Sequence, residues 1–297
     1  MQRWTQESDG ACLVRNSPDG GSRAPLTGEV NTMIEHAAAF HALHADPSRP
    51  LLLANVWDVA SARIVEEAGA PAVATTSAGV AWAVGRADGN ALQRADAVAA
   101  VSRITGAVSV PVTVDVEAGY AAGADGVERT VDAMLEAGAV GINIEDGALH
   151  PDELVDRISA ARRAALRAGV PLFVNARTDV YLGGLTAPEN LLAETLERAH
   201  RYLDAGADGV FVPGVGDRQT IATLVEAVAS PLNVMAGPGG LSVAELSRLG
   251  VARVSVGSSV AQAAYAVARR AAAELFDAGT YESLARGLDY GELNSLF

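Results

Sequence analysis

Acidic side chains stand at the ends of two short apolar segments of the chain. Asp115 and Glu117 end one of them, and Glu145 and Asp146 end the next. Residues i and i+2 of a strand point the same way, so Asp115 and Glu117 project toward one spot. Converging carboxylates repel one another unless a cation neutralises them, and Mg²⁺ or Mn²⁺ prefers oxygen ligands. The pattern predicts a divalent-metal site; the alternative is that these acids pair with Arg177 or face solvent.

Other polar residues follow neighbouring segments. The hydroxyl and N–H groups of Thr76, Ser77 and Ala78 form a turn of small residues suited to holding a carboxylate. Asp88 precedes a helical stretch and is either a further polar ligand or a turn residue. His150 is the one imidazole near these segments, and its ordinary pKa near 6.5 suits acid–base work. The alternative is an exposed histidine with no role.

The composition excludes several reaction classes. The chain has 22 basic and 36 acidic residues, a net charge of −14, and every basic residue is an arginine. Without lysine there is no Schiff-base enzyme, no lysine-bound pyridoxal phosphate and no lysine-bearing phosphate loop. An anionic substrate must be bound by arginine, by backbone N–H groups or by a metal. The acidic balance also predicts no nucleic-acid partner and no anionic membrane surface as partner.

The same composition bears on the compartment. A single cysteine, Cys12, cannot form an intrachain disulfide or supply a thiolate metal cluster. No apolar run approaches the ~20 residues of a membrane helix. The stretch Met1 to Arg15 lacks the basic-then-apolar order of a signal peptide. We expect a soluble, cytoplasmic protein.

A repeating pattern predicts the elements that position these residues. A helical segment, a glycine and a short apolar run recur along the chain, and a glycine just past a helix is typical of a left-handed cap. The cap glycines are Gly69, Gly106, Gly138, Gly169, Gly206 and Gly250. The predicted strands are Leu51–Ala54, Ala72–Thr75, Val112–Asp115, Gly141–Glu145, Leu172–Asn175, Gly209–Val212, Leu232–Met235 and Arg253–Val256.

Eight strands alternating with helices in about 250 residues predict a (β/α)₈ barrel, a TIM barrel of class α/β. A doubly wound open sheet is the alternative, but Asn55-Val56-Trp57-Asp58 stands where that fold more often has a Gly-rich phosphate turn. In a barrel, active sites lie at the C-terminal ends of the strands, where the acidic residues fall.

The ends of the chain differ from its middle. Residues 1–32 show neither helical nor strand periodicity and are expected to be a disordered tail. Residues 33–297 are therefore expected to form a single barrel domain. An Ala-rich helix is predicted through about Ala278, with a shorter helix after Gly279. We expect one of these helices to close the barrel and the other, surplus helix to dock on a neighbouring subunit.

In this order, the motifs resemble those of the isocitrate lyase and phosphoenolpyruvate mutase superfamily, over the chain from about Met33 to its end. The resemblance rests on several motifs in register on eight strands. They are Asn55-Val56-Trp57-Asp58 with Ser61-Ala62-Arg63, Thr76-Ser77-Ala78 with Gly85 and Asp88, Asp115-Val116-Glu117-Ala118-Gly119-Tyr120, Gly141-Ile142-Asn143-Ile144-Glu145-Asp146, Asn175-Ala176-Arg177-Thr178-Asp179 and Pro231-Leu232-Asn233-Val234-Met235.

The resemblance implies a role for each matching residue. Asp115 corresponds to the principal Mg²⁺ ligand, and three acids support the metal through its waters: Glu117, Glu145 and Asp88. Arg177 corresponds to the arginine that binds the substrate carboxylate, to which its planar fork is suited. The resemblance further implies a 2-oxo-acid cradle at Thr76, Ser77 and Ala78, and a polar residue at the far side of the pocket, Asn233. It also implies homo-oligomers, dimers or tetramers, that exchange the C-terminal helix.

One part of the family pattern is missing. The isocitrate and methylisocitrate lyases carry a loop after strand four with a lysine and a catalytic cysteine, and the mutase uses a lysine in a longer loop. Here the loop of residues 146–153 is short and contains neither lysine nor cysteine. At the end of strand six, Val212-Pro213-Gly214 stands in place of a carboxylate. The usual activities of these enzymes are therefore not expected.

These observations favour an Mg²⁺-dependent lyase that cleaves a C–C bond of a small 2-oxo or 2-hydroxy di- or tricarboxylate through a pyruvate-type enolate. Decarboxylation or a retro-aldol cleavage fits the short loop, and the expected catalytic residues are Arg177, Glu145 and His150. One alternative is a phosphonate enzyme, either a mutase or a phosphonopyruvate hydrolase. Another is a barrel that binds ligands without turnover.

Overall fold

The computed structural model describes residues 27–46 and 48–297. Eight parallel strands form one sheet in the order β1-β8-β7-β6-β5-β4-β3-β2. A bridge between Val56 and Thr75 joins β1 to β2, so the sheet closes. The strands are β1 Leu51–Leu53, β2 Val73–Ala74, β3 Val112–Asp115, β4 Gly141–Glu145, β5 Phe173–Arg177, β6 Gly209–Val212, β7 Leu232–Met235 and β8 Arg253–Ser255. This confirms the predicted (β/α)₈ barrel.

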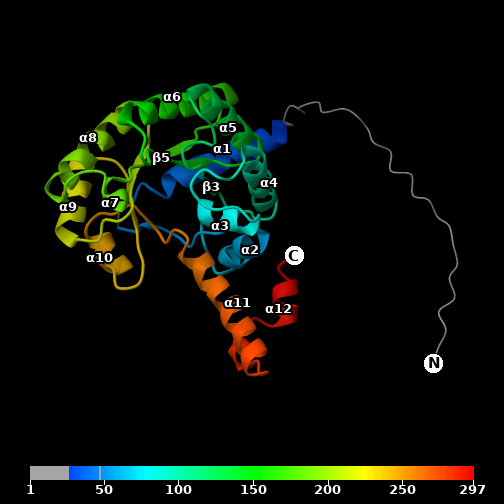
Figure 1. Cartoon of the computed structure of the whole chain (residues 1–297). Coiled ribbons are helices and arrows are strands. Elements are labelled where there is room, and N and C mark those ends of the chain that lie inside the picture. The colour runs from blue at the N-terminus through cyan, green and yellow to red at the C-terminus, as the bar shows by residue number, and fades with distance from the viewer. Residues whose placement is uncertain (1–26, 47) are drawn as a thin grey trace, which may run out of the picture.

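Helices surround the sheet (Figure 1). They are α1 Thr27–Ala42, α2 Val59–Glu67, α3 Ser77–Ala83, α4 Arg94–Thr105, α5 Ala124–Glu136, α6 Pro151–Ala168, α7 Val180–Gly183, α8 Leu191–Asp204, α9 Arg218–Val228, α10 Val243–Arg248, α11 Ser259–Asp277 and α12 Tyr290–Asn294, with 3₁₀ turns η1 Pro188–Asn190 and η2 Glu282–Leu284. Of the tail expected at residues 1–32, residues 1–26 lie outside the described part of the chain, and α1 begins at Thr27.

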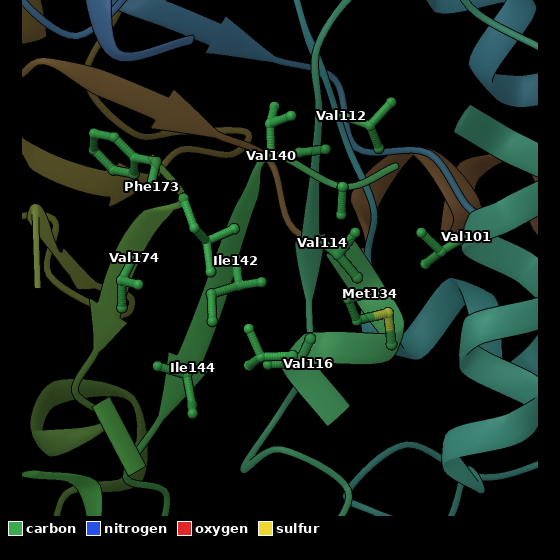
Figure 2. Packing of buried hydrophobic residues seen from close by; sticks show 14 of the residues in the cluster. Val101, Val112, Val114, Val116, Met134, Val140, Ile142, Ile144, Phe173 and Val174 are labelled. Carbon is green, nitrogen blue, oxygen red and sulfur yellow. The ribbon is translucent and has the colours of Figure 1, made fainter. Parts of the chain in front are cut away.

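Alternation along each strand separates the hydrophobic core from the interior of the barrel. Val114 and Ile142 belong to the large buried cluster between sheet and helices. Figure 2 shows them with Met134 of α5 in this packing. The residues that alternate with these along each strand face the barrel axis instead. On β3 to β5, the axis-facing residues near the C-terminal end are polar. The pleat thus sends apolar side chains to the helices and polar ones to the mouth.

The helix-to-strand glycines behave as predicted with one exception. Gly69, Gly138, Gly169, Gly206 and Gly250 all have positive φ, the conformation in which a β-carbon is disfavoured. The prediction is wrong at one position, because the glycine that ends α4 has φ −70° and continues the helical conformation.

The N-terminal end of the barrel is closed by α1. Phe40 is fully buried and contacts Phe173 at 5.5 Å between ring centroids. A β-carbon at Gly141 would lie 2.7 Å from the Phe40 ring, so glycine on β4 makes room for it. His44 stacks on Phe173, and its Nδ1 forms a 2.8 Å hydrogen bond with the carbonyl of Phe40. This plug leaves the opposite end of the barrel as the open mouth.

The C-terminal segment departs from expectation. The helix after β8 does not close the barrel: α11 extends away from it (Figure 1), and Ala261 alone is buried along its length. As a result Leu52, on the outer face of β1, is 46% exposed. The chain then returns along α11, and Arg63 of α2 donates a 2.7 Å hydrogen bond to the carbonyl of Leu296. We call residues 259–297 the C-terminal arm.

Within the described residues, none of the helices combines the length and apolar character needed to cross a membrane.

Candidate active site

Carboxylates from neighbouring strands meet at the mouth of the barrel. Asp115 ends β3 and Glu145 ends β4, and these strands pair directly. One Asp115 oxygen accepts the Glu117 N–H at 3.1 Å, and the other accepts the Ser77 hydroxyl at 3.3 Å. The strand ends therefore bring Asp115, Glu117 and Glu145 together, as the sequence predicted. We call them, with Asp88, the acidic cluster.

Glu117 is held in an unusual backbone conformation. It is 2% exposed and has φ +50°, in the left-handed region that non-glycine residues rarely adopt. Its Oε2 accepts a short hydrogen bond from the N–H of Asn90, and its Oε1 is buried without a hydrogen-bond partner in the described residues. A buried carboxylate oxygen without a partner is costly, which points to a ligand at this position.

Arg177 stands beside the acidic cluster. The β4–β5 register places it directly next to Glu145, with Nη1 2.7 Å from Glu145 Oε2. Asp179 binds its Nε and Nη2 at 2.6 and 3.0 Å, a bidentate fork. The guanidinium also lies over the Phe211 ring, 5.8 Å from its centroid. Its orientation is thus set by two carboxylates and an aromatic ring.

The charges shift one another's protonation. Burial raises the pKa of Asp115, although Arg177 opposes the shift. Burial raises the pKa of Glu117 to about 7, and the charges of Asp115 and Asp88 add to it. Burial also raises the pKa of Glu145 despite its ion pair. Burial alone would lower the pKa of Arg177, but Glu145 and Asp115 outweigh it, so the guanidinium stays charged. The acids therefore favour a nearby cation.

The cluster fits a hard divalent cation. Its donors are carboxylate oxygens, the ligands that Mg²⁺ and Mn²⁺ prefer, and Glu117 Oε1 has no other partner among the described residues. Across residues 27–46 and 48–297, no group of three His, Cys, Asp or Glu side chains is arranged to enclose a metal directly. An ion bound by one carboxylate does not need such a group, because Mg²⁺ keeps several waters that other acids can bind.

The predicted carboxylate cradle is the start of a helix. Thr76 precedes α3 with an extended backbone, and Ser77 and Ala78 are the first two residues of the helix. No side chain caps this end, so its first N–H groups remain available to an acceptor. Because the Ser77 hydroxyl contacts Asp115, the cradle and the acidic cluster share one edge of the mouth.

The other predicted residues have these places. Asp88 is exposed on the loop after α3, near enough to raise the pKa of Glu117. Asn233 is buried inside the barrel, where its amide accepts from Asn175 at 3.1 Å and donates to the backbone carbonyl of Arg253. His150 caps α6, its side chain is 67% exposed, and its ring lies 3.2 Å from Asp152 rather than against the acidic cluster.

The sequence grouped Asp146 with the acids of the predicted metal site, but the structure gives both of its carboxylate oxygens protein partners. Its side chain is fully buried and accepts the Asp179 N–H at 2.8 Å through one oxygen. The other oxygen accepts from Arg198 at 3.0 Å and from the Tyr202 hydroxyl at 2.8 Å. Asp146 therefore fixes Asp179, which in turn fixes Arg177. The signal was its adjacency to Glu145 at the same strand end.

Two further residues were missed. Asn90 lies on the loop after α3 and gave no signal in the sequence. Arg157 lies on α6 and is 5% exposed. Its signal was its position, because helical spacing places it on the buried face with Leu154, Ile158 and Ala161.

Comparison with known proteins identifies the family of the chain. The family model for phosphoenolpyruvate phosphomutase matches residues 40–276. The chain belongs to this family, within the isocitrate lyase and phosphoenolpyruvate mutase superfamily, whose members are carbon–carbon lyases or mutases.

The relatives span several activities. An uncharacterized protein of Mycobacterium tuberculosis is 38% identical over 259 residues, which cover 86% of this chain and 95% of that protein. The 2-methylisocitrate lyase of Escherichia coli is 32% identical over 197 residues, 62% of this chain and 64% of the lyase. The structure of 2,3-dimethylmalate lyase is 28% identical, covers 88% of this chain and 94% of that chain, and has a TM-score of 0.77.

Proposed function

We propose that the chain is a divalent-metal-dependent lyase that cleaves a C–C bond of a small 2-oxo or 2-hydroxy dicarboxylate or tricarboxylate and releases a pyruvate-type 2-oxo acid. The observation that carries the proposal is the meeting of Asp115, Glu117 and Glu145 with Arg177 at the barrel mouth. It combines a place for a cation with a guanidinium for a carboxylate.

The protein's own residues bind and orient the substrate. Arg177 has five N–H groups, of which two bind Asp179 and one faces Glu145, and the remaining two receive a substrate carboxylate. The free N–H groups at Ser77 and Ala78 bind the oxygens of the 2-oxo-acid end. Glu145, paired with Arg177, holds the guanidinium in this position. The substrate is thus bound between two strand ends and a helix start.

A Mg²⁺ or Mn²⁺ ion would be held by Asp115, with Glu117, Glu145 and Asp88 binding its waters. When bound, it supplies a Lewis acid that stabilises negative charge developing on the substrate oxygens. After the C–C bond breaks, the electron pair stays on a carbon of the 2-oxo acid product. That carbon takes a proton from water or from His150, whose ring lies on the loop after β4.

Oxaloacetate-like C4 acids are the favoured substrates. The loop after β4 is short and carries neither lysine nor cysteine. A decarboxylation in which water supplies the proton needs no proton donor from this loop. An oxaloacetate decarboxylase of Paraburkholderia xenovorans is 32% identical to this chain over 203 residues, which supports the decarboxylation. A retro-aldol cleavage of a substituted malate is the other reaction that fits this short loop.

The test is a panel of 2-oxo and 2-hydroxy dicarboxylates and tricarboxylates, with release of 2-oxo acid followed in Mg²⁺ and in EDTA. We expect turnover of at least one C4 acid, its loss in EDTA and its loss in Asp115→Ala. Turnover that is unaffected by EDTA and by this substitution would contradict the proposal.

A second candidate is phosphonate chemistry, either a mutase or the hydrolysis of phosphonopyruvate. The observation in its favour is the family match together with the structure of a phosphonomutase-like protein from Burkholderia cenocepacia, 45% identical, which covers 80% of this chain and 98% of that chain with a TM-score of 0.75. Phosphorus NMR of phosphonopyruvate with the protein separates the two, because a new phosphorus signal appears only if the C–P bond is rearranged or broken.

The C-terminal arm supports a proposal about assembly, in which it docks on a second copy of the chain in a homodimer or homotetramer. Phe276 and Tyr290 on the arm are more than four-fifths exposed, and Leu52 is left uncovered where a closing helix would pack. Analytical ultracentrifugation of the full chain and of a chain ending at Ala278 tests this. We expect the shortened chain to dissociate more readily, and a monomeric full chain would contradict the proposal.

A further inference from the structure

The segment that follows β3 carries an unusual run of backbone conformations. Glu117 and Tyr120 both have φ +50°, and Gly119 between them has φ +96°. Left-handed φ costs conformational energy at residues other than glycine, so such a run persists only where surrounding contacts enforce it. Because Glu117 belongs to the acidic cluster, those contacts decide where its carboxylate lies.

Neighbouring elements bind the carbonyl groups of this segment. The Glu117 carbonyl accepts the N–H of Glu145 at 3.0 Å, and the Gly119 carbonyl accepts the Thr130 hydroxyl at 2.8 Å. A β-carbon at Gly119 would lie 2.6 Å from Val127, so the turn is pressed closely against α5. These contacts hold the middle of the segment.

Arg157 of α6 holds the two sides of the turn. Its Nη1 donates a short hydrogen bond to the Ala118 carbonyl and a 3.4 Å bond to the Ala121 carbonyl. The nearest carboxylate is that of Glu153, 3.9 Å away and half exposed. A buried guanidinium is thus turned toward two backbone carbonyls rather than toward a close ion pair. Because hydrogen bonds from a charged donor are stronger than neutral ones, these two bonds hold the turn firmly.

We propose that Arg157 is a positioning residue: by binding the Ala118 and Ala121 carbonyls it holds the turn of residues 117–121, with its left-handed Glu117, Gly119 and Tyr120, and so keeps the Glu117 carboxylate in the acidic cluster. The inference rests on the proposed function, in which Glu117 serves the metal. Arg157 itself contacts neither substrate nor metal.

The surroundings of Arg157 allow a chemical test. A cavity of about 530 Å³ is lined by Arg157, Ala118 and Ala121, together with Asn90 and Leu149. A small guanidinium compound can therefore reach the place that a shortened side chain leaves. Arg163 is the matched control, since it lies on the same helix, is half exposed and binds Glu128 at 3.0 Å rather than the turn.

The experiment compares wild type, R157M, R157A with and without ethylguanidinium, and R163M. Three quantities are measured: Mn²⁺ affinity by electron paramagnetic resonance, amide hydrogen exchange of residues 117–121, and the melting temperature. Losing one or two charged hydrogen bonds corresponds to an affinity about 10-fold to 100-fold lower. We expect that loss in R157M and R157A, faster exchange confined to residues 117–121, recovery with ethylguanidinium, and wild-type behaviour in R163M.

Several results would overturn the inference. They are wild-type Mn²⁺ affinity and exchange in R157M, or exchange that rises equally over the whole protein with no recovery by ethylguanidinium. If wild type binds no Mn²⁺, the proposed function fails, while exchange and recovery at residues 117–121 still decide the role of Arg157. If R157M and R157A do not fold, R157Q is used: its side chain is neutral and two bonds shorter, so it cannot reach both carbonyls, and wild-type affinity and exchange in R157Q would count against the inference.

Discussion

Asp146 offers a strong test of how the site is supported, through the substitution Asp146→Asn. The side chain is fully buried and binds Arg198, Tyr202 and the N–H of Asp179. Asparagine retains one acceptor oxygen for the Asp179 N–H but turns an NH₂ group toward the Arg198 donor. The nearly buried guanidinium then loses its fully buried charged partner and keeps only Glu194, 2.7 Å from its Nε. Breaking a buried ion pair by removing one partner costs about 3–5 kcal/mol of the free energy of unfolding.

The expected magnitude sets the assay. At about 2 °C per kcal/mol for a domain of this size, the melting temperature falls by about 6–10 °C, and urea unfolding gives the free energy directly. Asp152→Asn is the control. Asp152 pairs with Arg201, one turn along α8 from Arg198, but its side chain is 69% exposed. An exposed pair contributes at most about 1 kcal/mol, so this substitution has little effect.

A double substitution completes the design. In D146N/R198M the guanidinium that lost Asp146 is gone, so the loss of stability is smaller than the sum of the single losses by about 0.5–3 kcal/mol. We also expect kcat/KM to fall in D146N, because the amide oxygen that remains is a neutral and weaker acceptor for the Asp179 N–H, which it fixes beside Arg177. A stability loss below about 1 kcal/mol, equal to that of the exposed control, would refute this reasoning.

Further predictions concern the charges and the backbone of the site. Arg177→Lys lowers kcat/KM by about 100-fold in steady-state assays, because an ammonium cannot form the fork with Asp179; unchanged kinetics would contradict the assigned role. The pKa of Glu117 is about 7, so Mg²⁺ binding releases about half a proton from this group at pH 7 and almost none at pH 9, and affinity falls as pH drops below 7. Calorimetry in two buffers of different ionisation enthalpy measures this, and equal release at both pH values would disprove it. Gly119→Ala destabilises the protein by about 1–3 kcal/mol in urea unfolding, because φ is +96° and the new methyl meets Val127 at 2.6 Å; a neutral substitution would show that the turn adapts.

Most of the barrel was predictable from the sequence because its signals are local. Buried parallel strands read as short apolar runs, and every predicted strand lies within two residues of the observed one at each end. Five of the six cap glycines have the expected left-handed conformation. The acidic residues at the mouth were equally visible because they end apolar runs. Glu117, however, lies beyond β3 with φ +50°, so the turn after the strand, and not the strand pleat, places it beside Asp115.

The C-terminal helix shows where local signals stop. An Ala-rich helix was predictable from residues 259–278, but its packing partner was not. The helical pattern says which face is apolar, and it does not say which surface that face meets. In the structure α11 leaves the barrel, and Leu52 is exposed as a result.

The sequence by itself determined the class of fold, the presence of several acids and one arginine at one end of it, and the absence of lysine and of a cysteine near the loop after β4. These follow from composition and from the period of the chain. Only the tertiary structure decided which charges meet: the β4–β5 register pairs Arg177 with Glu145, α8 brings Arg198 to Asp146, and α6 brings Arg157 to the turn that carries Glu117. Contacts between residues distant in sequence depend on register and helix packing, which no local pattern records.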